Sequence, residues 1–229
     1  MLAEVILITV GIVVAMQFDD WNKNKENKEQ TIVLLQQLEV DFKELKAVTL
    51  LGIEELKEGR ENIAILYKAC GKENYFTNYE LGVLFTSSTT LIRLEFDMGI
   101  LNEAINTGKI SLIENSELRL LLSSWDRVLK VIDARIASME DILILHQKTT
   151  MQYIPWRDFD NVYFPDLELG NTQLILNGND IFKNPIFENN IGQKYWFNTE
   201  LEKTYNEKIL SQSDKILELI QTELAGDKE

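Results

Sequence analysis

The chain has 229 residues, 45% of them hydrophobic, and a formal net charge of −14. This length and composition fit one domain with a sizeable core, or one domain with an insertion. The excess of 37 acidic over 23 basic residues argues against a nucleic-acid binder, which needs a basic face. A single cysteine, Cys70, excludes an intramolecular disulfide and a cysteine-based zinc site.

The N-terminal stretch Leu2–Phe18 is apolar, with Glu4 as its one charge. As a helix it is roughly 26 Å long, at the short end for a membrane span. Phe18 and Trp21 stand where interfacial aromatic residues belong. A basic n-region and a small-residue cleavage site, typical of signal peptides, are missing. The stretch predicts a transmembrane anchor over residues 1–19; the alternative is an uncleaved signal-like or buried core helix.

Several positions in and after this stretch form a pattern: Glu4, Gly11, Ile12, Ala15, Gln17, Trp21 and Asn22. The pattern resembles the N-terminal signature of an uncharacterised family of single-pass membrane proteins from Bacteroidota, especially flavobacteria, which reads G-E-I-x-L-V-x-x-G-I-x-I-A-L-Q-I-N-N-W-N. A looser similarity follows at Ile105–Ile110 and Asn115–Arg119. The chain departs from the family in lacking a basic, aromatic stretch before the span and in having Asp19 and Asp20 for the asparagine pair. The resemblance implies a location and a shape, and no activity.

The orientation of the anchor is open between two readings. Lys23, Lys25 and Lys28 follow the span and no basic residue precedes it, so the positive-inside rule puts the body in the cytoplasm. The family's usual basic N-terminus would instead put the body in the periplasm, and Met1 need not be the true start. We expect a single-pass protein of the inner membrane with a periplasmic body. Gly11 and Ala15 would let two anchors approach closely, which permits self-association.

Long helices are predicted next, because no proline occurs before Pro155. The first runs from about Asp20 to Ala69 and stops at Gly71. Its apolar positions step by three and four residues, as in a bundle or coiled coil. They are Leu35, Leu38, Phe42, Leu45, Leu56, Ile63 and Leu66.

Two short helices are expected to follow. Thr77 and Glu80 have the spacing of a capping box, which opens a helix through about Phe85. The run Thr86–Thr90 is interpreted as a loop or a cap. The second short helix spans Met98 to Asn106, with Asp97 as its cap and Gly108 as its end.

The rest of the chain predicts two more long helices and the region between them. One starts at Asn115 or Ser116 and ends before Pro155, and the last spans about Phe187 to Leu224. Residues 155–186 are an aromatic-rich loop insertion, with a short strand at Gln173 to Leu176. The predicted fold is all-α: a transmembrane helix continuing into an antiparallel bundle of three long and two short helices over residues 20–229.

Catalytic and metal chemistry finds little support in the sequence. His146 is the one histidine, and no second histidine or cysteine completes a zinc set with it. Asn177–Asp180 together with Glu188 imitates the two ends of a calcium loop, but Ile181 and Phe182 occupy positions that need a ligand and a glycine. A nucleophilic Ser87 or Ser88 would need a base close in space. Cys70 is expected to be a half-buried residue at a helix end rather than a reactive thiol. We expect no cofactor and no metal.

Aromatic side chains in the insertion are the best candidates for function, because loops often carry binding residues. Exposed rings flanked by Asp and Asn resemble the anchors of protein interfaces. The alternative is that the rings fold back and cap the end of the bundle. The candidate surface consists of Trp156, Phe159, Tyr163, Phe164 and Phe182.

The hypothesis from sequence is therefore a non-enzymatic, membrane-anchored scaffold of the bacterial cell envelope. Its expected partners are the lipid bilayer and other envelope proteins or a second copy of itself, and not nucleic acid. The alternative function is that of a periplasmic small-molecule sensor built from a helical bundle. An enzyme would need a cluster of acidic residues around His146 that only the fold could assemble.

Overall fold

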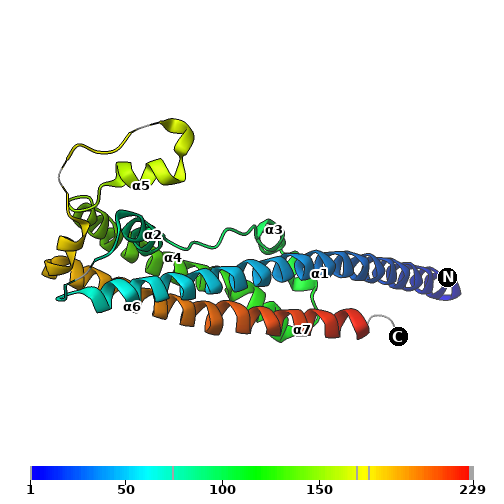
Figure 1. Ribbon diagram of the computed structural model, residues 1–229. Coiled ribbons are helices and arrows are strands. Elements are labelled where there is room, and N and C mark those ends of the chain that lie inside the picture. Colours follow the sequence, from blue (N-terminus) through cyan, green and yellow to red (C-terminus); the bar gives the residue numbers. More distant parts are fainter. Residues whose placement is uncertain (1, 74, 169, 175, 227–229) are drawn as a thin grey trace. The chain divides into compact units, whose positions relative to one another are not determined.

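The computed structural model describes residues 2–73, 75–168, 170–174 and 176–226, with the side chains of 2–7, 162, 163 and 165 outside the description. The described chain is helical, which confirms the all-α fold class (Figure 1). Its α-helices are α1 (Leu2–Ala69), α2 (Asn78–Thr89), α3 (Gly99–Asn106), α4 (Ser116–Thr150), α5 (Trp156–Tyr163), α6 (Pro185–Thr204) and α7 (Ser211–Gly226). Shorter turns are η1 (Lys109–Leu112), η2 (Pro165–Leu167), η3 (Gly178–Lys183) and the π-helical η4 (Tyr205–Leu210).

The chain divides into two compact units. Unit 1 contains residues 1–46, 96–125 and 212–229, and unit 2 contains residues 47–95 and 126–211. The expected boundaries, an anchor over 1–19 and one bundle domain over 20–229, stay a prediction.

Unit 1 buries apolar side chains from α1, α3, the start of α4 and α7. Phe42 and Trp125 meet edge to face, with ring centroids 5.0 Å apart. The Glu223 carboxylate of α7 accepts hydrogen bonds from the backbone N–H groups of Glu114 and Asn115, just before α4 begins. The buried apolar residues of α1 and α4 in this unit are Leu34, Leu35, Leu38, Phe42, Leu45, Leu118, Leu122 and Trp125.

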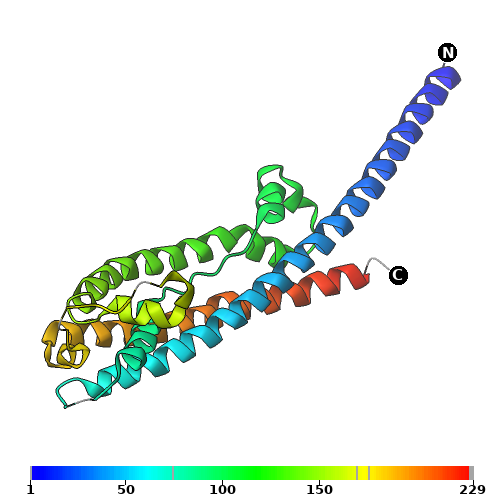
Figure 2. The same cartoon turned by 45° about the horizontal axis from the view of Figure 1, so that its top comes forward.

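The first turns of α1 leave the core of unit 1 and project beyond the C-terminal end of α7 (Figure 2). Every described side chain from Ile8 to Gln30 is exposed, and the first buried one is Thr31. We call residues 8–21 the N-terminal arm. Among the described residues, no helix combines the length and the apolar character needed to cross a membrane. Of the anchor predicted over residues 1–19, the side chains before Ile8 lie outside the described part of the chain.

Unit 2 packs the second half of α1 against α2, the later part of α4, η3 and α6. Phe85 and Phe182 both lie edge to face with Phe187, at 5.7 and 5.9 Å between ring centroids. Gly71 ends this part of α1 with a φ of +72°, as predicted, in a region that glycine adopts without strain. The cluster around these rings includes Ile63, Leu66, Leu81, Phe85, Ile154, Ile181, Phe182, Phe187 and Ile191.

The capping box of Thr77 and Glu80 is confirmed, but the end predicted for that helix was wrong. α2 continues through Thr89 and Thr90 is its C-cap, so Thr86–Thr89 is the last turn of the helix rather than a loop, and the alternative of a cap holds for Thr90 alone. Thr86 and Ser87 fit into the helix because their hydroxyls donate hydrogen bonds to the carbonyls of Gly82 and Val83, four residues earlier.

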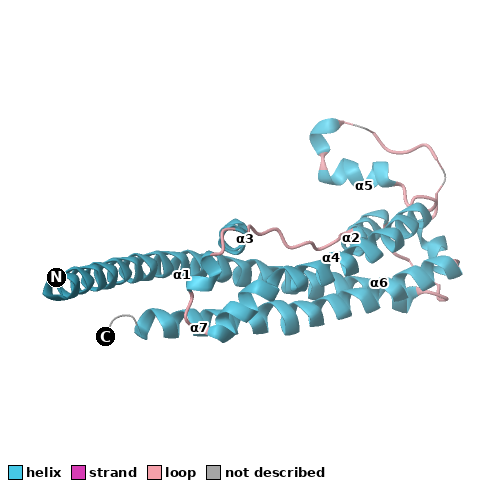
Figure 3. Cartoon of the chain, turned by 180° about the vertical axis from the view of Figure 1, so that it is seen from behind, coloured by secondary structure: helices cyan, strands magenta, loops and turns pink. Residues whose placement is uncertain are grey.

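The aromatic-rich insertion also differs from the prediction. Most of it is helical turns, α5, η2 and η3, joined by a loop (Figure 3). The strand expected at Gln173 to Leu176 is missing from its described residues, Gln173, Leu174 and Leu176. The helix predicted from Phe187 starts earlier, at Pro185, because Asn184 caps it by accepting from the N–H of Ile186 at 2.8 Å.

Candidate functional site

The five aromatic residues expected to form one exposed surface have different environments. Phe159 and Phe182 are buried, Trp156 is half-buried and Phe164 is exposed. The side chain of Tyr163 lies outside the described residues. These positions correct the prediction of a shared surface, since two of the rings belong to the core of unit 2.

Close packing explains the burial of Phe159 and Phe182. A Cβ on Gly82 would lie only 1.8 Å from Cδ2 of Phe159, so the ring occupies the space that a side chain of α2 would fill. Phe182 lies between Phe76 and Phe187, with ring centroids 5.6 and 5.9 Å away. Both rings therefore attach the insertion to α2 and α6, the arrangement that the sequence analysis kept as its alternative.

The other candidate residues have structural contacts. Burial raises the pKa of the Cys70 thiol to about 11, with the Glu188 carboxylate adding to the effect. The Asn179 side chain accepts from the N–H of Phe76 and donates to its carbonyl, at 3.0 and 2.9 Å. Within the described part of the chain, no group of three His, Cys, Asp or Glu side chains could hold a metal ion.

A polar cluster in the core of unit 2 was missed by the sequence analysis. The hydroxyl of Ser88 lies 2.9 Å from Nε2 of His146, and both residues are at most 1% exposed. The His146 ring stacks on Phe187, with ring centroids 5.7 Å apart. Lys194, also buried, donates from Nζ to the carbonyl of Thr90 at 2.8 Å. The cluster joins α2, α4 and α6.

Hydrogen bonding assigns the histidine tautomer. The Ser88 hydroxyl donates to the carbonyl of Phe85 at 2.9 Å, so its oxygen is left to accept from Nε2–H of His146. Nδ1 then carries the lone pair, and no partner for it exists among the described residues. A histidine that activates a serine needs the opposite arrangement, with a bare Nε2 facing the hydroxyl and a carboxylate on Nδ1–H.

Burial sets the charges of the cluster. It lowers the pKa of His146 to about 4, and the nearby charge of Lys194 lowers it further in the same direction. Burial also lowers the pKa of Lys194 to about 8. At neutral pH the imidazole is therefore neutral and the lysine is mostly protonated. A neutral, enclosed imidazole suits a structural role better than proton transfer.

Open cavities lie elsewhere in both units. In unit 1 a groove of about 430 Å³ lies between α1 and α3, with Val33, Leu34 and Ile100 among its lining residues. In unit 2 a smaller pocket of about 180 Å³ lies beside Gly59 of α1 and Asn198 of α6. Neither cavity is lined by Ser88 or His146. Comparisons with family models, with curated proteins and with solved structures find no match for this chain.

Proposed function

We propose that this chain is a single-pass, membrane-anchored helical protein of the bacterial cell envelope that binds other envelope proteins and catalyses no reaction. The observation that carries the proposal is the N-terminal arm, an apolar helix whose side chains are left exposed by the described residues of unit 1. The resemblance of the arm to the Bacteroidota family agrees with this location.

Apolar side chains are exposed on every side of the arm. Ile12, Val13 and Val14 follow one another at about 100° per residue, so together they cover most of the helix circumference. A helix that is apolar all round is covered by a large protein core or by lipid, whereas a partner groove needs one apolar stripe. Phe18 and Trp21, 63% and 58% exposed, close the arm with ring centroids 5.7 Å apart. Their position suits the interface between lipid and water.

The sequence adds apolar length before the first described side chain, at Leu2, Val5, Ile6 and Leu7. At the end of the arm α1 becomes charged, beginning with an ion pair between Asp19, inside the arm, and Lys23, just after it, at 2.8 Å. This change fits a helix that leaves the bilayer and continues into the body of the protein.

Unit 2 offers a surface for a protein partner. Tyr67 of α1 lies close to α6, with its hydroxyl 3.5 Å from where a Cβ on Gly192 would stand. Tyr195 and Trp196, the latter 63% exposed, follow on α6. Tyrosine and tryptophan are enriched among residues that dominate binding energy at interfaces. We propose Tyr67, Tyr195 and Trp196 as the partner-binding surface.

A hydrolytic function is disfavoured by the geometry of the Ser88–His146 pair. Both side chains are enclosed, the tautomer is the wrong one for activating a serine, and Nδ1 faces no carboxylate among the described residues. These features support a non-enzymatic function.

Extraction of membranes with alkaline carbonate tests the anchor. The full chain should stay in the membrane pellet, and Ile12→Lys with Val13→Lys should release it, because a lysine at the centre of a span costs about 3 kcal/mol. Val40→Lys is the matched control, since Val40 is an exposed valine of the same helix outside the arm. Release of the unaltered chain would refute the anchor.

Cross-linking in intact cells followed by mass spectrometry tests partner binding. Trp196→Ala should reduce the recovered partner, and Ile186→Ala, which changes another exposed residue of α6, should not. An equal yield from both variants would refute the proposed surface.

A further inference from the structure

A segment of unit 2 without helical turns, residues 91–95, follows α2 and belongs to the loop that joins α2 to α3 (Figure 3). We call it the link. Thr90 leads into it with extended backbone angles, a φ of −71° and a ψ of 135°. Exposure alternates along it, because Ile92 and Leu94 are half-buried whereas Arg93 and Glu95 are exposed. This period of two residues is that of a β-strand lying with one face on the protein.

Contacts with α1 and α4 hold the link in place. A Cβ on Gly52 of α1 would lie 2.6 Å from Cδ2 of Leu94 and 3.5 Å from Cγ2 of Ile92, so both side chains pack against the glycine. On the exposed side, Arg93 pairs with Glu140 of α4 at 2.9 Å. A segment that is fixed before binding loses less conformational freedom when a partner arrives.

One edge of the link faces α6 and η4. The Thr90 carbonyl accepts from Nζ of Lys194 at 2.8 Å, and the Ile92 carbonyl accepts from the hydroxyl of Tyr205 at 3.3 Å. In a strand, the N–H and C=O of one residue point to the same edge, and those of the next residue point to the opposite edge. The even-numbered residues of the link therefore direct their backbone groups toward α6 and η4.

The opposite edge of the link is unpaired. The backbone N–H and C=O groups of Leu91, Arg93 and Glu95 make no hydrogen bond within the described part of the chain. A row of unpaired groups on an extended segment is a template for pairing with another chain. Extended peptides bind to such edges through main-chain hydrogen bonds. Because the link already packs on helices, a second strand would complete a two-stranded sheet with a supported face.

Negative charge surrounds the link. Glu95 is exposed and forms no ion pair among the described residues. Glu55 and Glu58 of α1 line the pocket that also reaches Thr90 and Ile92, so two further carboxylates lie beside the start of the link. Charge complementarity therefore favours a partner segment that carries basic side chains.

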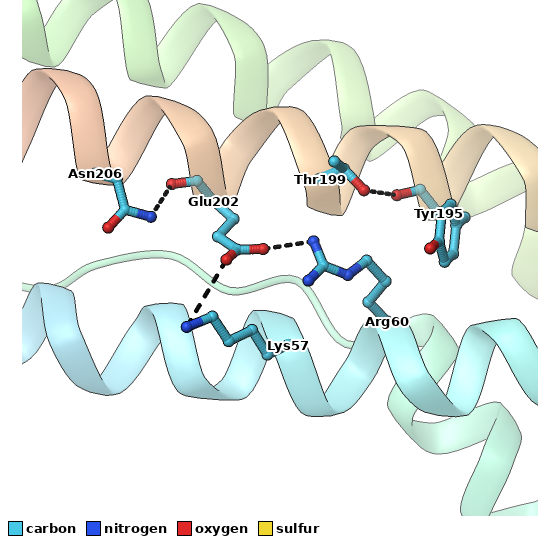
Figure 4. Close-up of polar contacts among 6 residues, drawn as sticks. All are labelled: Lys57, Arg60, Tyr195, Thr199, Glu202 and Asn206. Atoms are coloured by element: carbon cyan, nitrogen blue, oxygen red, sulfur yellow. Dashed lines mark hydrogen bonds and ion pairs between the residues drawn. The ribbon is translucent and has the colours of Figure 1, made fainter.

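The basic side chains of the same region are already paired. Lys57 and Arg60 both contact the Glu202 carboxylate of α6, at 3.9 and 2.5 Å (Figure 4). Arg93 is paired with Glu140, as described above. These cations are therefore engaged elsewhere, and the carboxylates near the link remain available to a partner.

We propose that the link binds an extended, lysine- or arginine-bearing segment of a partner protein as an added β-strand. The segment would pair with the backbone groups of Leu91, Arg93 and Glu95, and the nearby carboxylates would attract its basic side chains. The site shares no residue with the partner-binding surface on α1 and α6 and does not require the anchor. The inference therefore goes beyond the proposed function, and either one can fail without the other.

Hydrogen exchange of the full chain in dodecyl maltoside micelles, measured by NMR with and without the peptide acetyl-Lys-Val-Lys-Val-Lys-Val-amide, tests the site. In the free chain the amides of Leu91, Arg93 and Glu95 should exchange without protection. Saturating peptide should slow these three amides by at least ~10-fold, and should leave the amides of Ile92 and Leu94 nearly unchanged. The same peptide with every backbone nitrogen methylated keeps its charges but cannot donate, so it should give no protection.

Arg93→Pro and Arg93→Ala form a matched pair of variants. Both lose the ion pair with Glu140, but only proline removes the backbone N–H at this position, and its φ suits an extended segment. Arg93→Pro should weaken peptide binding ~10-fold relative to Arg93→Ala, the equivalent of about one hydrogen bond. Equal melting temperatures of the two variants would show that the fold is intact.

Glu95→Gln tests the charge. It should weaken binding about 2–5-fold, as expected for an exposed ion pair, whereas Glu54→Gln, an exposed glutamate of α1 outside the pocket, should not. Several results would overturn the proposal: no protection by the peptide, equal protection by the methylated peptide, or protection confined to Ile92 and Leu94. Equal affinity of Arg93→Pro and Arg93→Ala would overturn it as well, since pairing would not then involve this edge.

Discussion

Acid should destabilise the fold through His146. Burial and the charge of Lys194 lower the pKa of His146 from 6.5 to about 4. The unfolded chain therefore takes up a proton as the pH falls below about 6.5, while the folded chain resists protonation until about 4. The neutral imidazole makes its full contribution to stability above pH 6.5, and this contribution is lost as the pH falls from 6.5 to 4. At about 1.4 kcal/mol per pH unit, the loss is about 3 kcal/mol.

Urea unfolding followed by circular dichroism at pH 7, 6, 5 and 4 measures this loss. Carboxylates titrate in the same range, so His146→Leu is the reference, because leucine stays neutral throughout. Lys194 remains protonated over this window, since its pKa is about 8. The unaltered chain should lose about 3 kcal/mol more than His146→Leu between pH 7 and pH 4. Parallel pH profiles would refute the reasoning.

Three further predictions follow from contacts within each unit. Gly82→Ala should lower the free energy of unfolding, because the new Cβ would stand 1.8 Å from the Phe159 ring and displace it. A double-mutant cycle measures the coupling: the loss caused by Gly82→Ala should be smaller in a Phe159→Ala background. Cys70 should react with Ellman's reagent at pH 8 far more slowly in the folded than in the unfolded chain, because burial raises its pKa to about 11; equal rates would contradict this. Glu223→Ala should cost about 1 kcal/mol in urea unfolding by removing the acceptor at the start of α4. The control Glu218→Ala, which breaks an exposed pair with Lys215, should cost less than about 0.5 kcal/mol.

Local patterns predicted the helices well. The spacing of Leu35, Leu38, Phe42 and Leu45 placed all four in the core, because residues three and four apart share one helix face. The capping box at Thr77 and the stop at Gly71 were also predicted, since both depend on a few neighbouring residues.

Contacts between distant residues could not be predicted in the same way. Ser88 and His146 are 58 positions apart and meet only when α2 and α4 pack together. The burial of Phe159 likewise depends on Gly82, and neither residue alone signals the contact. Charged and aromatic composition in the insertion resembled a loop, although Trp156–Tyr163 forms a helix.

The run Thr86–Thr90 shows why the end of α2 was predicted wrongly. Its hydroxyls donate to the carbonyls of Gly82, Val83, Phe85 and Thr86. These bonds let five serine and threonine residues end a helix rather than form a loop. The Thr90 carbonyl, just after this last turn, accepts from Nζ of Lys194 at 2.8 Å. The side chains that made the run look like a loop therefore satisfy carbonyls of the last turns of α2 from within the helix.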